Sequence, residues 1–493
     1  MSRFPFDTLL VANRGEIALR IIRTAQRLGL RTVLVAHADD AGSPAIAAAD
    51  QVMAIAGCTG VATYLDADQI IAAAQRSGAG AIHPGYGFLS ENAAFALAVA
   101  AAGMAFVGPT ADAIDLMGDK VRARAFVARH GFPVAPSAVE DDDPSTFVER
   151  AHALGAPLLV KPSAGGGGKG MRIVRDMTLL AREIAQARSE GERYFGDGRL
   201  YVERFVEEPR HIEVQVLGDA HGTVLHLGER ECSVQRRFQK IVEETPSPAL
   251  SPVQRAQICE TAAGIARAAG YRNAGTVEFI FGNGAFYFLE MNTRLQVEHP
   301  VTEMVTGIDL VEAQLRVAAG EPLGFAQEDV QARGHAIELR LYAESPSRGF
   351  TPTTGRVLAL RLPEGDGVRV DVGIARGQRI TTAFDPMLAK LIVHGADRQE
   401  AIVRARRALA DFALLGCETN AAFLDRLMAD PDFAGAAVHT GWIDAHPDLA
   451  AEPELDPRTR LALAAVAALS TRSVRDAADA VPRLHASIGG WRN

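Results

Sequence analysis

Apolar runs and helical patterns alternate along the first quarter of the chain. Residues 8–12 (TLLVA) predict a buried strand, residues 15–28 (GEIALRIIRTAQRL) predict a helix that ends at Gly29, and residues 31–36 (RTVLVA) predict a second strand. Because a strand, a helix and a strand at this spacing form a βαβ unit, we expect a parallel sheet. The alternation continues through GAIHPG and MAFVGP, so residues 1–115 are predicted to form one doubly wound α/β domain.

The pattern changes in the rest of the chain. Residues 141–144 (DDDP) indicate a solvated loop that leads into a helix. From about residue 206, stretches such as HIEVQVLGD, TVEFIF and AFYFLEM predict strands, and their spacing favours antiparallel hairpins. After about residue 448, the stretch DPRTRLALAAVAALSTRSVRDAADA predicts an amphipathic helix with Asp456 as its N-cap and Pro457 in its first position.

Residues 165–170 (GGGGKG) form a glycine-rich run whose backbone can approach an anion closely. They do not form a Walker A motif, because Lys169 is followed by Gly170 instead of a hydroxyl residue. They match the letters of G-x-G-x-x-G, but the following residues, MRIVR, predict a strand and not a helix. We favour a hairpin tip that folds over a triphosphate, with Lys161 and Lys169 adding charge, and a tip without a ligand is the alternative.

A second set of polar residues lies in a predicted hairpin over residues 275–299, whose turn is GNG. A three-residue loop with Gly284 in the left-handed conformation pairs Glu278 with Glu290 on one face of the sheet. Asn292 then lies two positions further along the same face if the strand continues. Two carboxylates and an amide oxygen are suited to a magnesium ion that bridges phosphates.

The polar alternation continues beyond this set. Arg294, Gln296 and Glu298 occupy even positions, whereas the odd positions are mostly apolar. We interpret the series as part of the same site, and an edge strand with one solvated face is the alternative. The stretch SVQRRFQKIVEE adds an amide and three cationic side chains nearby in sequence, and its alternative interpretation is a solvated basic loop.

Composition narrows the classes of function. The chain has 493 residues, enough for several domains, and its net charge of −9 without a basic tract disfavours a nucleic-acid partner. It has no apolar run of about 18 residues and no signal-peptide pattern, so neither a membrane span nor secretion is expected. Its four cysteines form no C-x-x-C pair, which disfavours a zinc site and a disulfide framework. We therefore expect a cytoplasmic protein.

Several long motifs together resemble those of biotin carboxylase, an ATP-grasp enzyme that carboxylates biotin in biotin-dependent carboxylases. They are ANRGEIALR, IHPGYGFLSEN, MGDK, GGGGKGM, RHIEVQV, QRRFQK, FLEMNTRLQVEHPVTEM and GHAIELR. The resemblance runs from about residue 5 to about residue 446. It implies an ATP-dependent ligase, namely the biotin carboxylase portion of an acyl-CoA carboxylase α subunit, with a place in fatty acid metabolism.

The resemblance also implies an ATP-grasp fold with a mobile lid. The expected parts are a Rossmann-like N-terminal domain (1–115), a helical linker (116–132), a lid (133–205), a catalytic core (206–333), an antiparallel β-rich C-terminal domain with helices (334–448) and a helical extension or linker (449–493).

Roles for individual residues follow from the same resemblance. The nucleotide site is expected to comprise Lys120, Lys161, Gly165, Gly166, Gly167, Gly168, Met171, Glu203, Val206, His211, Gln235 and Ile280. Magnesium or manganese is expected at Glu278, Glu290 and Asn292. Bicarbonate is expected at Lys240, Arg294, Gln296 and Val297, and biotin at Tyr86 and Arg340.

In the implied reaction Glu298 deprotonates bicarbonate, which attacks the γ-phosphate of ATP to form carboxyphosphate. Carboxyphosphate breaks down to CO2 and phosphate, phosphate takes the N1 proton of biotin, and Arg340 stabilises the ureido oxyanion. The expected catalytic residues are therefore Glu298, Arg340, Lys240 and Arg294. The lid excludes water because carboxyphosphate hydrolyses readily.

Two features depart from the family pattern. Phe238 stands where many members have a histidine near the nucleotide, and an aromatic ring donates no hydrogen bond there. No A-M-K-M biotinylation sequence occurs, so biotin is expected on a carrier on another chain or beyond this sequence. The implied partners are a biotin carboxyl carrier protein or domain and a carboxyltransferase β subunit, in a homodimer or a larger α/β assembly. The sequence does not specify the final acceptor.

Two other functions stand as alternatives. Another ATP-grasp carboxylate–amine ligase, of the D-alanine ligase or carbamoyl phosphate type, would share the lid and the magnesium carboxylates. It has no reason to contain RLQVEHPVTEM together with GHAIELR. A nucleotide-binding regulatory module without catalysis has no need of the intact set of Lys240, Arg294, Glu298 and Arg340.

Overall fold

The computed structural model describes residues 4–163, 170–451 and 456–469. By its internal contacts the chain forms two units, Met1–Leu449 and Ala450–Asn493. Among the described residues, no helix is both long enough and apolar enough to cross a lipid bilayer.

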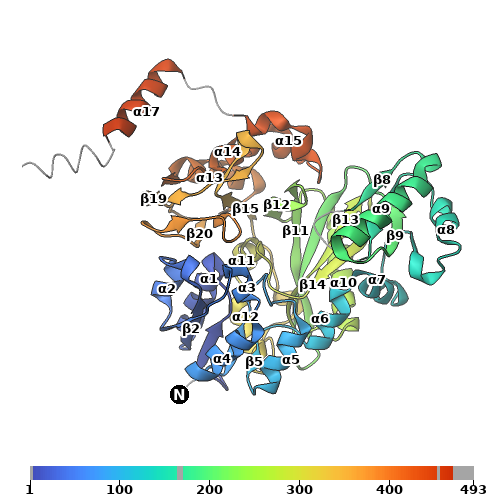
Figure 1. Ribbon diagram of the computed structural model, residues 1–493, viewed down its shortest axis with the longest axis horizontal. Helices are drawn as coiled ribbons and strands as arrows, with labels where there is room; N and C mark the ends of the chain where they lie inside the picture. Colours follow the sequence, from blue (N-terminus) through green and yellow to red (C-terminus); the bar gives the residue numbers. More distant parts are fainter. Residues whose placement is uncertain (1–3, 164–169, 452–455, 470–493) are drawn as a thin grey trace, which may run out of the picture. The chain divides into compact units, whose positions relative to one another are not determined.

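A five-stranded parallel sheet forms the N-terminal part of the larger unit (Figure 1). In the order β3-β2-β1-β4-β5, its strands are β1 (Thr8–Val11), β2 (Arg31–Ala36), β3 (Gln51–Ala54), β4 (Ala81–His83) and β5 (Ala105–Phe106). The helices of this part are α1 (Gly15–Arg27), α2 (Pro44–Ala48), α3 (Gly60–Tyr64), α4 (Ala67–Ser77), α5 (Ala93–Ala101) and α6 (Ala111–Gly118). The strand order reverses at β1, so the predicted doubly wound domain is confirmed.

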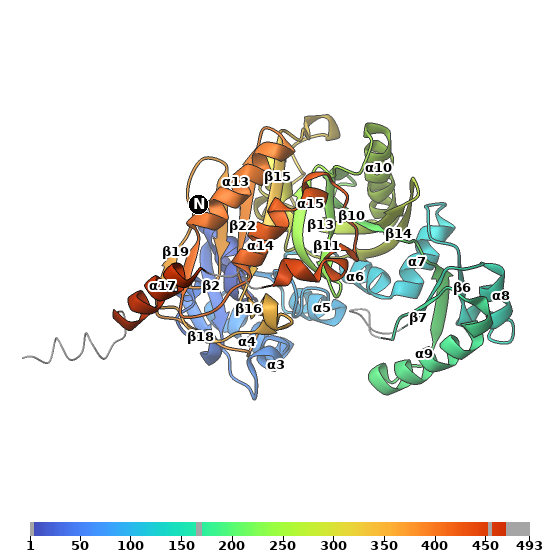
Figure 2. The same cartoon turned by 90° about the horizontal axis from the view of Figure 1, so that it is seen from above.

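A small antiparallel sheet follows, in the order β6-β9-β7-β8. Its strands are β6 (Ser137–Val139), β7 (Leu158–Pro162), β8 (Arg172–Val174) and β9 (Leu200–Arg204). Helix α7 (Lys120–Arg129) precedes it, and α8 (Phe147–Ala153) and α9 (Leu180–Phe195) pack against it (Figure 2). Strands β7 and β8 form the predicted hairpin around the glycine-rich run, whose residues 164–169 lie outside the described residues.

An eight-stranded antiparallel sheet lies at the centre of the larger unit, in the order β14-β13-β10-β11-β12-β15-β22-β20. Its strands are β10 (Arg210–Gly218), β11 (Val224–Arg236), β12 (Gln239–Thr245), β13 (Asn273–Gly282), β14 (Ala285–Asn292), β15 (His335–Tyr342), β20 (Val368–Val372) and β22 (Met387–Gly395). The predicted antiparallel strands after residue 206 are thus confirmed. Because β12 pairs with β15, one sheet continues across residues 333 and 334, where the expected domain boundary falls.

Helices and short strands surround this sheet. The helices are α10 (Pro252–Ala268), α11 (His299–Thr306), α12 (Leu310–Ala318), α13 (Arg398–Asp411), α14 (Ala421–Ala429), α15 (Pro431–Ala434) and α16 (Trp442–Ala445). The short strands are β16 (Glu344–Ser345), β17 (Thr351–Pro352), β18 (Gly355–Arg356), β19 (Ala359–Arg361), β21 (Arg379–Ile380) and β23 (Ala413–Leu415).

The hairpin of β13 and β14 reaches its predicted pairing by a different route. Its loop has two residues, Asn283 and Gly284, both with positive φ (52° and 77°). A two-residue loop in regular register would place Glu278 opposite Leu289. A β-bulge shifts the register by one residue, so Glu278 pairs with Glu290 instead. The predicted pairing is therefore confirmed, and the predicted three-residue loop is wrong.

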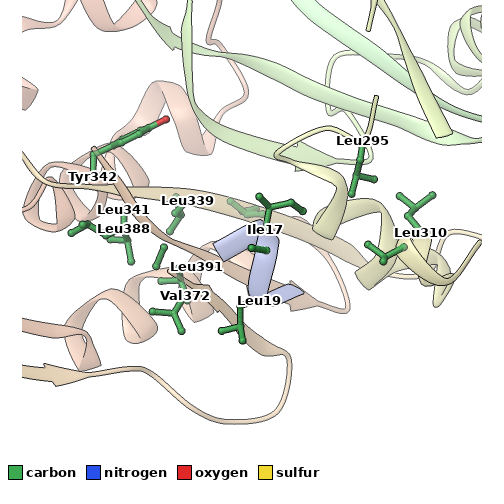
Figure 3. Packing of buried hydrophobic residues seen from close by; sticks show 14 of the residues in the cluster. Ile17, Leu19, Leu295, Leu310, Leu339, Leu341, Tyr342, Val372, Leu388 and Leu391 are labelled. Atoms are coloured by element: carbon green, nitrogen blue, oxygen red, sulfur yellow. The ribbon is translucent and has the colours of Figure 1, made fainter. Parts of the chain in front are cut away.

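The largest buried cluster joins the N-terminal domain to the central sheet (Figure 3). Ile17 and Leu19 of α1 belong to the same cluster as Leu339 of β15 and Leu391 of β22. Leu295, from the loop after β14, is part of it as well, and it is 0% exposed. Each such side chain contributes about 2 kcal/mol when it leaves water. The same apolar contacts that join the domains therefore also anchor the loop after β14.

The second unit contains one described helix, α17 (Pro457–Leu469). Asp456 Oδ1 accepts hydrogen bonds from the backbone amides two and three residues further on, at 3.0 and 3.1 Å, so the predicted N-cap is confirmed. The apolar side chains of α17, such as Leu461, are exposed. The predicted continuation of this helix beyond residue 469 lies outside the described residues.

We expect Leu339→Ala to lower the free energy of unfolding by about 2–5 kcal/mol, because it opens a cavity in the cluster that joins the two domains. Chemical denaturation followed by circular dichroism measures the loss. The matched control is Leu461→Ala, at a residue that is 72% exposed, for which we expect a change below about 0.5 kcal/mol. Equally small losses in both variants would contradict the described core.

Candidate functional site

A cavity of about 830 Å³ opens between the small antiparallel sheet, the central sheet and the loop after β14. Most of the residues singled out from the sequence line it. They are Lys120, Lys161, Met171, Glu203, Val206, His211, Gln235, Lys240, Glu278, Ile280, Glu290, Asn292, Arg294, Gln296, Val297, Glu298 and Arg340. Phe238 lines it too, at the turn between β11 and β12, with 61% of its surface exposed.

Among the described residues, one predicted member of the site, Tyr86, is not among those that line the cavity. Tyr86 is half-buried, and its hydroxyl donates a hydrogen bond to Glu16 Oε1. The four glycines predicted to contact nucleotide lie outside the described residues; they are Gly165, Gly166, Gly167 and Gly168.

The ammonium group of Lys240 is the electrostatic centre of the cavity. Its Nζ lies 2.5 Å from Glu213 Oε2, 2.6 Å from Glu298 Oε1 and 2.9 Å from Glu278 Oε1. Burial alone would lower the pKa of Lys240, but these carboxylates more than offset that effect and hold the pKa well above its ordinary value. Lys240 therefore keeps its charge, and three carboxylates share it.

The register of the central sheet brings the carboxylates together. Glu213 of β10 lies opposite Glu278 of β13, which lies opposite Glu290 of β14, so the three side chains share one face. Carboxylates in such positions repel one another unless cations compensate them. His211 Nε2 lies 2.7 Å from Glu278 Oε2, and Lys120 Nζ lies 2.9 Å from Glu290 Oε2. Acidic side chains on this face thus lie next to basic ones.

The sequence analysis did not identify Glu213, nor Arg230, which forms an ion pair with Glu213 in addition to that of Lys240. The Arg230 side chain is 0% exposed, and its Nε donates to Glu213 Oε1 at 2.5 Å. Its other nitrogens donate to Gln215, Thr276 and Thr302. A signal existed in the sequence, since Glu213 is a lone acid inside the apolar strand HIEVQV, and a buried acid needs a cationic partner.

Glu298 lies between two cations. It is 1% exposed, and its Oε2 lies 3.0 Å from an Arg340 nitrogen while its Oε1 contacts Lys240. Burial alone would raise the pKa of Glu298, but Lys240 and Arg340 together lower it below the ordinary range. Arg340 also pairs with Glu243 at 2.5 Å, where burial raises the carboxyl pKa to about 7. Glu298 is therefore ionised at neutral pH.

The residues between β14 and α11 form a loop and not a strand. Strand β14 ends at Asn292, and α11 begins at His299, so the strand does not continue through the polar series. Gln296 is 3% exposed and Glu298 is 1% exposed, so the alternative of a solvated face is wrong. The loop bends at Arg294 and turns at Val297 and Glu298 before α11 begins, so the polar side chains reach the cavity through the loop and not through a strand.

Hydrogen bonds hold this loop in one conformation. Arg294 Nη1 donates to Gln296 Oε1 at 2.5 Å, and Arg294 Nε donates to Glu91 Oε2 at 2.9 Å. Gln296 Nε2 in turn donates to Glu278 Oε1 at 3.0 Å. Glu91 also accepts the backbone amide of Thr293 at 3.0 Å. The N-terminal domain thereby fixes the loop through Glu91, which sequence reasoning missed.

The donor set predicted for a metal fits a hard cation. Glu278 and Glu290 offer carboxylate oxygens, and Asn292 donates from Nδ2 to Glu278 Oε1 at 2.7 Å, so the three side chains converge. In the structure, the ammonium groups of Lys240 and Lys120 pair with these carboxylates. A divalent cation would also compensate the negative charge of these carboxylates, and it is smaller than the side chains that do so here. Mg2+ prefers oxygen donors of this kind.

The lysines predicted to reach phosphate line the cavity from two elements, Lys161 from β7 of the small sheet and Lys120 from the first position of α7. Lys161 Nζ pairs with Glu203 Oε1, and Lys120 pairs with Glu290. Val206 and Ile280 add apolar lining to the same cavity. Cationic and apolar surfaces in one cavity suit a ligand that has both an anionic and an aromatic part.

Three family descriptions match consecutive parts of the chain. Residues 5–114 match "Biotin carboxylase, N-terminal domain", residues 119–326 match "Carbamoyl-phosphate synthase L chain, ATP binding domain", and residues 338–445 match "Biotin carboxylase C-terminal domain".

Curated relatives match over most of the chain. The "Biotin carboxylase" of Allochromatium vinosum is 46% identical over 437 residues, which cover 88% of this chain and 97% of the relative. A pyruvate carboxylase subunit of Methanothermobacter thermautotrophicus is 44% identical over 442 residues, 90% of each chain. The mitochondrial methylcrotonoyl-CoA carboxylase α subunit of Arabidopsis thaliana is 46% identical over 465 residues, 93% of this chain and 63% of that protein.

Solved structures agree with the fold. The biotin carboxylase of Campylobacter jejuni, in a β-γ-ATP complex, has a TM-score of 0.86 and 40% identity, covering 90% of this chain and 99% of that chain. The biotin carboxylase domain dimer of Hydrogenobacter thermophilus 2-oxoglutarate carboxylase, in complex with MgADP, ADP and bicarbonate, has a TM-score of 0.86 and 43% identity. That match covers 91% of this chain and 99% of that chain.

We expect Lys240→Met to destabilise the protein by about 3–5 kcal/mol at pH 8, because it leaves three buried carboxylates without their shared cation. Their folded-state pKa values then rise above the ordinary value of about 4.3. A raised carboxyl pKa gives full stability only below the unfolded pKa, and stability falls as the pH rises through the folded pKa. The loss should therefore be smaller at pH 5 than at pH 8, as measured by urea unfolding.

The control for this prediction is Arg122→Met, which removes an exposed ion pair with Asp115 at 2.9 Å. We expect it to cost less than about 1 kcal/mol at either pH. A loss in Lys240→Met that is the same at both pH values would contradict the charge balance described here.

Proposed function

The chain belongs to the biotin carboxylase family of ATP-dependent ligases, and we propose that separate groups of residues in the cavity carry the steps of biotin carboxylation. The observation that carries this proposal is the buried, ionised Glu298 held between Lys240 and Arg340, beside the polar side chains of Arg294 and Gln296. A base among cations suits an anionic substrate that must lose a proton before it reacts.

In this proposal Lys240, Arg294 and Gln296 bind bicarbonate, with Val297 at the same loop. Glu298 removes the proton of bicarbonate, and the oxygen so exposed forms a bond to the γ-phosphorus of ATP while the bond to ADP breaks. The product is carboxyphosphate. When bicarbonate contacts Lys240, the attraction between the Lys240 ammonium and the Glu298 carboxylate becomes weaker. This raises the pKa of Glu298 and makes Glu298 a stronger base.

Carboxyphosphate then breaks down to CO2 and phosphate, and phosphate accepts the N1 proton of biotin. Arg340 stabilises the negative charge on the ureido oxygen, because a guanidinium aimed at a developing oxyanion is worth several kcal/mol in a site without water. Its pairing with two carboxylates supports this role, since they hold the guanidinium in one orientation. Tyr86 is proposed to contact biotin next to Arg340.

Glu278, Glu290 and Asn292 are proposed to hold Mg2+, or Mn2+ in its place. Bound there, the ion supplies positive charge that screens the phosphates of ATP. Lys120 and Lys161 are proposed to bind the phosphates, and Glu203, Val206, His211, Gln235, Ile280 and Met171 to line the rest of the nucleotide site. Residues 133–205 are proposed to act as the lid, with the glycine-rich run at its tip.

The biotin itself is proposed to arrive on a carrier protein or domain, and a carboxyltransferase subunit to complete the reaction, in a homodimer or a larger assembly. The relatives support this proposal, because they include subunits of pyruvate and methylcrotonoyl-CoA carboxylases. The match to the methylcrotonoyl-CoA carboxylase α subunit of Arabidopsis thaliana covers 63% of that longer protein.

ADP formation by the purified chain tests the proposed function. We expect ADP to form only when bicarbonate is present and to form faster when free biotin or a biotinylated carrier is added. A carboxylate–amine ligase would instead require an amino acid or ammonia, and it would ignore biotin. A chain that binds ATP without any such turnover would support the regulatory alternative.

We expect Glu298→Gln to lower the bicarbonate-dependent turnover by about 10²–10⁴-fold, with the KM for ATP nearly unchanged, because it removes the base and keeps the shape of the side chain. The matched control is Glu344→Gln, at a buried carboxylate that pairs with Arg236 and does not line the cavity. Unchanged turnover in Glu298→Gln would contradict the assignment of the base.

We expect Glu290→Gln to raise the Mg2+ concentration needed for half-maximal activity by about tenfold or more, because one of two anionic ligands is lost. A titration with Mn2+, followed by electron paramagnetic resonance, measures the binding without turnover. The KM for bicarbonate serves as the internal control and should stay within about twofold. An unchanged metal requirement would show that Glu290 is not a ligand.

A further inference from the structure

Lys390 of β22 is a fully buried lysine that the proposed reaction does not use. Its side chain is 0% exposed, and its Nζ donates a hydrogen bond to the backbone carbonyl of Val297 at 2.7 Å. Nζ also lies 3.2 Å from Glu16 Oε1 and 3.9 Å from Asp371 Oδ2. An ammonium group without contact with water has lost its hydration free energy, so interactions with its partners must offset that loss.

The position of Lys390 in the sheet relates it to Arg340. The two residues lie directly opposite each other on β22 and β15, so their side chains share one face. Arg340 contacts the carboxylate of Glu298, and Lys390 contacts the carbonyl of the residue before it. Two neighbouring cations thus hold two consecutive residues of the loop, one by its side chain and the other by its backbone.

Lys390 remains charged in this environment. Burial alone would lower its pKa, but the carboxylates of Glu16, Glu338 and Asp371 more than offset that effect and raise the pKa above its ordinary value. A charged ammonium has three protons to donate and no lone pair to accept. The carbonyl of Val297 therefore has a permanent donor, and the hydrogen bond is charge-assisted and correspondingly strong.

Glu16 connects this lysine to the N-terminal domain. It is the second residue of α1, it is 4% exposed, and its Oε1 also accepts the hydroxyl proton of Tyr86. The backbone there is tightly packed, because a Cβ at Gly373, the residue after β20, would lie 2.7 Å from the Glu16 backbone nitrogen. The backbone of Glu16 therefore has little room to move, and its carboxylate ties Lys390 to the N-terminal domain.

We propose that Lys390, held by Glu16, is a positioning residue that fixes the backbone of the loop carrying Arg294, Gln296 and Glu298. This inference rests on the proposed function, since it concerns the same bicarbonate site. With the carbonyl of Val297 fixed, the polar side chains on either side of it point into the cavity together. Without that hydrogen bond the loop can move by a fraction of an ångström, and bicarbonate then meets the base in a range of poses.

The position of the hydrogen bond determines which kinetic constants change. The contact lies at the bicarbonate end of the cavity, and the residues proposed to bind ATP phosphates, Lys120 and Lys161, have other partners. Loss of the contact should therefore affect bicarbonate use and leave ATP binding almost unchanged. A lysine with a purely structural role would instead lower stability and affect all kinetic constants alike.

The test compares four versions of the 493-residue chain: the unmodified protein, Lys390→Met, the double variant Lys390→Met/Glu16→Gln, and Arg398→Met. Lys390→Met leaves Glu16 without its cation, so a loss of thermal stability is expected. The double variant removes both charges of the pair, and stability should largely return. Arg398→Met is the matched control, because it removes a cation that pairs with the buried Glu244 at 2.6 Å, away from the loop.

We expect kcat/KM for bicarbonate to fall by about 10–100-fold in both Lys390 variants, because small misplacements of reacting groups cost about that much. The KM for ATP should stay within about twofold in every chain. The decisive comparison is the double variant, which should regain its melting temperature without regaining the bicarbonate constant. Arg398→Met should lose stability and keep normal bicarbonate kinetics.

Three results would overturn the positioning role. They are unchanged bicarbonate kinetics in Lys390→Met, recovery of those kinetics together with the melting temperature in the double variant, and an equal kinetic loss in Arg398→Met. If Lys390→Met does not fold, the double variant decides by itself. Failure of the proposed function is separate, because it appears in the unmodified chain as an absence of ADP formation with bicarbonate and biotin.

Discussion

The site depends on one interaction, the buried ammonium group of Lys240. Three carboxylates share it, those of Glu213, Glu278 and Glu298. Three carboxylates cannot remain ionised together in a space shielded from water unless a cation lies among them. The carboxylates hold the pKa of Lys240 above its ordinary value, and Lys240 in turn offsets burial at Glu278 and Glu298, whose pKa values it helps to lower. Ligands that bring their own charges, such as a metal, a triphosphate or bicarbonate, must bind by exchange with these pairs.

This constraint explains why the site is built from three parts of the chain. The central sheet supplies the carboxylates in register, the loop after β14 supplies Glu298, and the N-terminal domain braces that loop through Glu91 and Glu16. The apolar cluster around Leu295 joins the same three parts. Interactions between charges a few ångströms apart depend strongly on distance, so they need a rigid scaffold. The close-packed apolar cluster provides that rigidity.

Much of the fold follows from local patterns in the sequence. The βαβ spacing predicts the doubly wound domain, the change of period near residue 206 predicts antiparallel strands, and Asp456 is predicted as a cap from its position before Pro457. The pairing of Glu278 with Glu290 is predicted correctly although the loop is not, because a bulge replaces the extra loop residue. Bulges depend on how a strand fits its neighbours, and no short stretch of sequence encodes that fit.

The candidate site is predictable only in part. Long motifs identify the residues that line the cavity, and RHIEVQV and IHPGYGFLSEN also contain Glu213 and Glu91. The sequence does not show, however, which distant residues these two and Lys390 contact. The continuity of one sheet from β10 to β20 is likewise a long-range property. For Glu213 and Lys390, a buried charge inside an apolar strand is a local signal, and it shows that a partner is needed without showing which residue it is. Glu91 is exposed and lies outside the strands, so it carries no such signal.

The most direct test of the account follows one oxygen atom. If bicarbonate attacks the γ-phosphorus of ATP and carboxyphosphate then loses CO2, one oxygen of bicarbonate must remain on the released phosphate. Turnover with ¹⁸O-labelled bicarbonate in unlabelled water, analysed by mass spectrometry of phosphate, measures this transfer. The account predicts one labelled oxygen in each phosphate formed in a bicarbonate-dependent turnover, and unlabelled phosphate would contradict it.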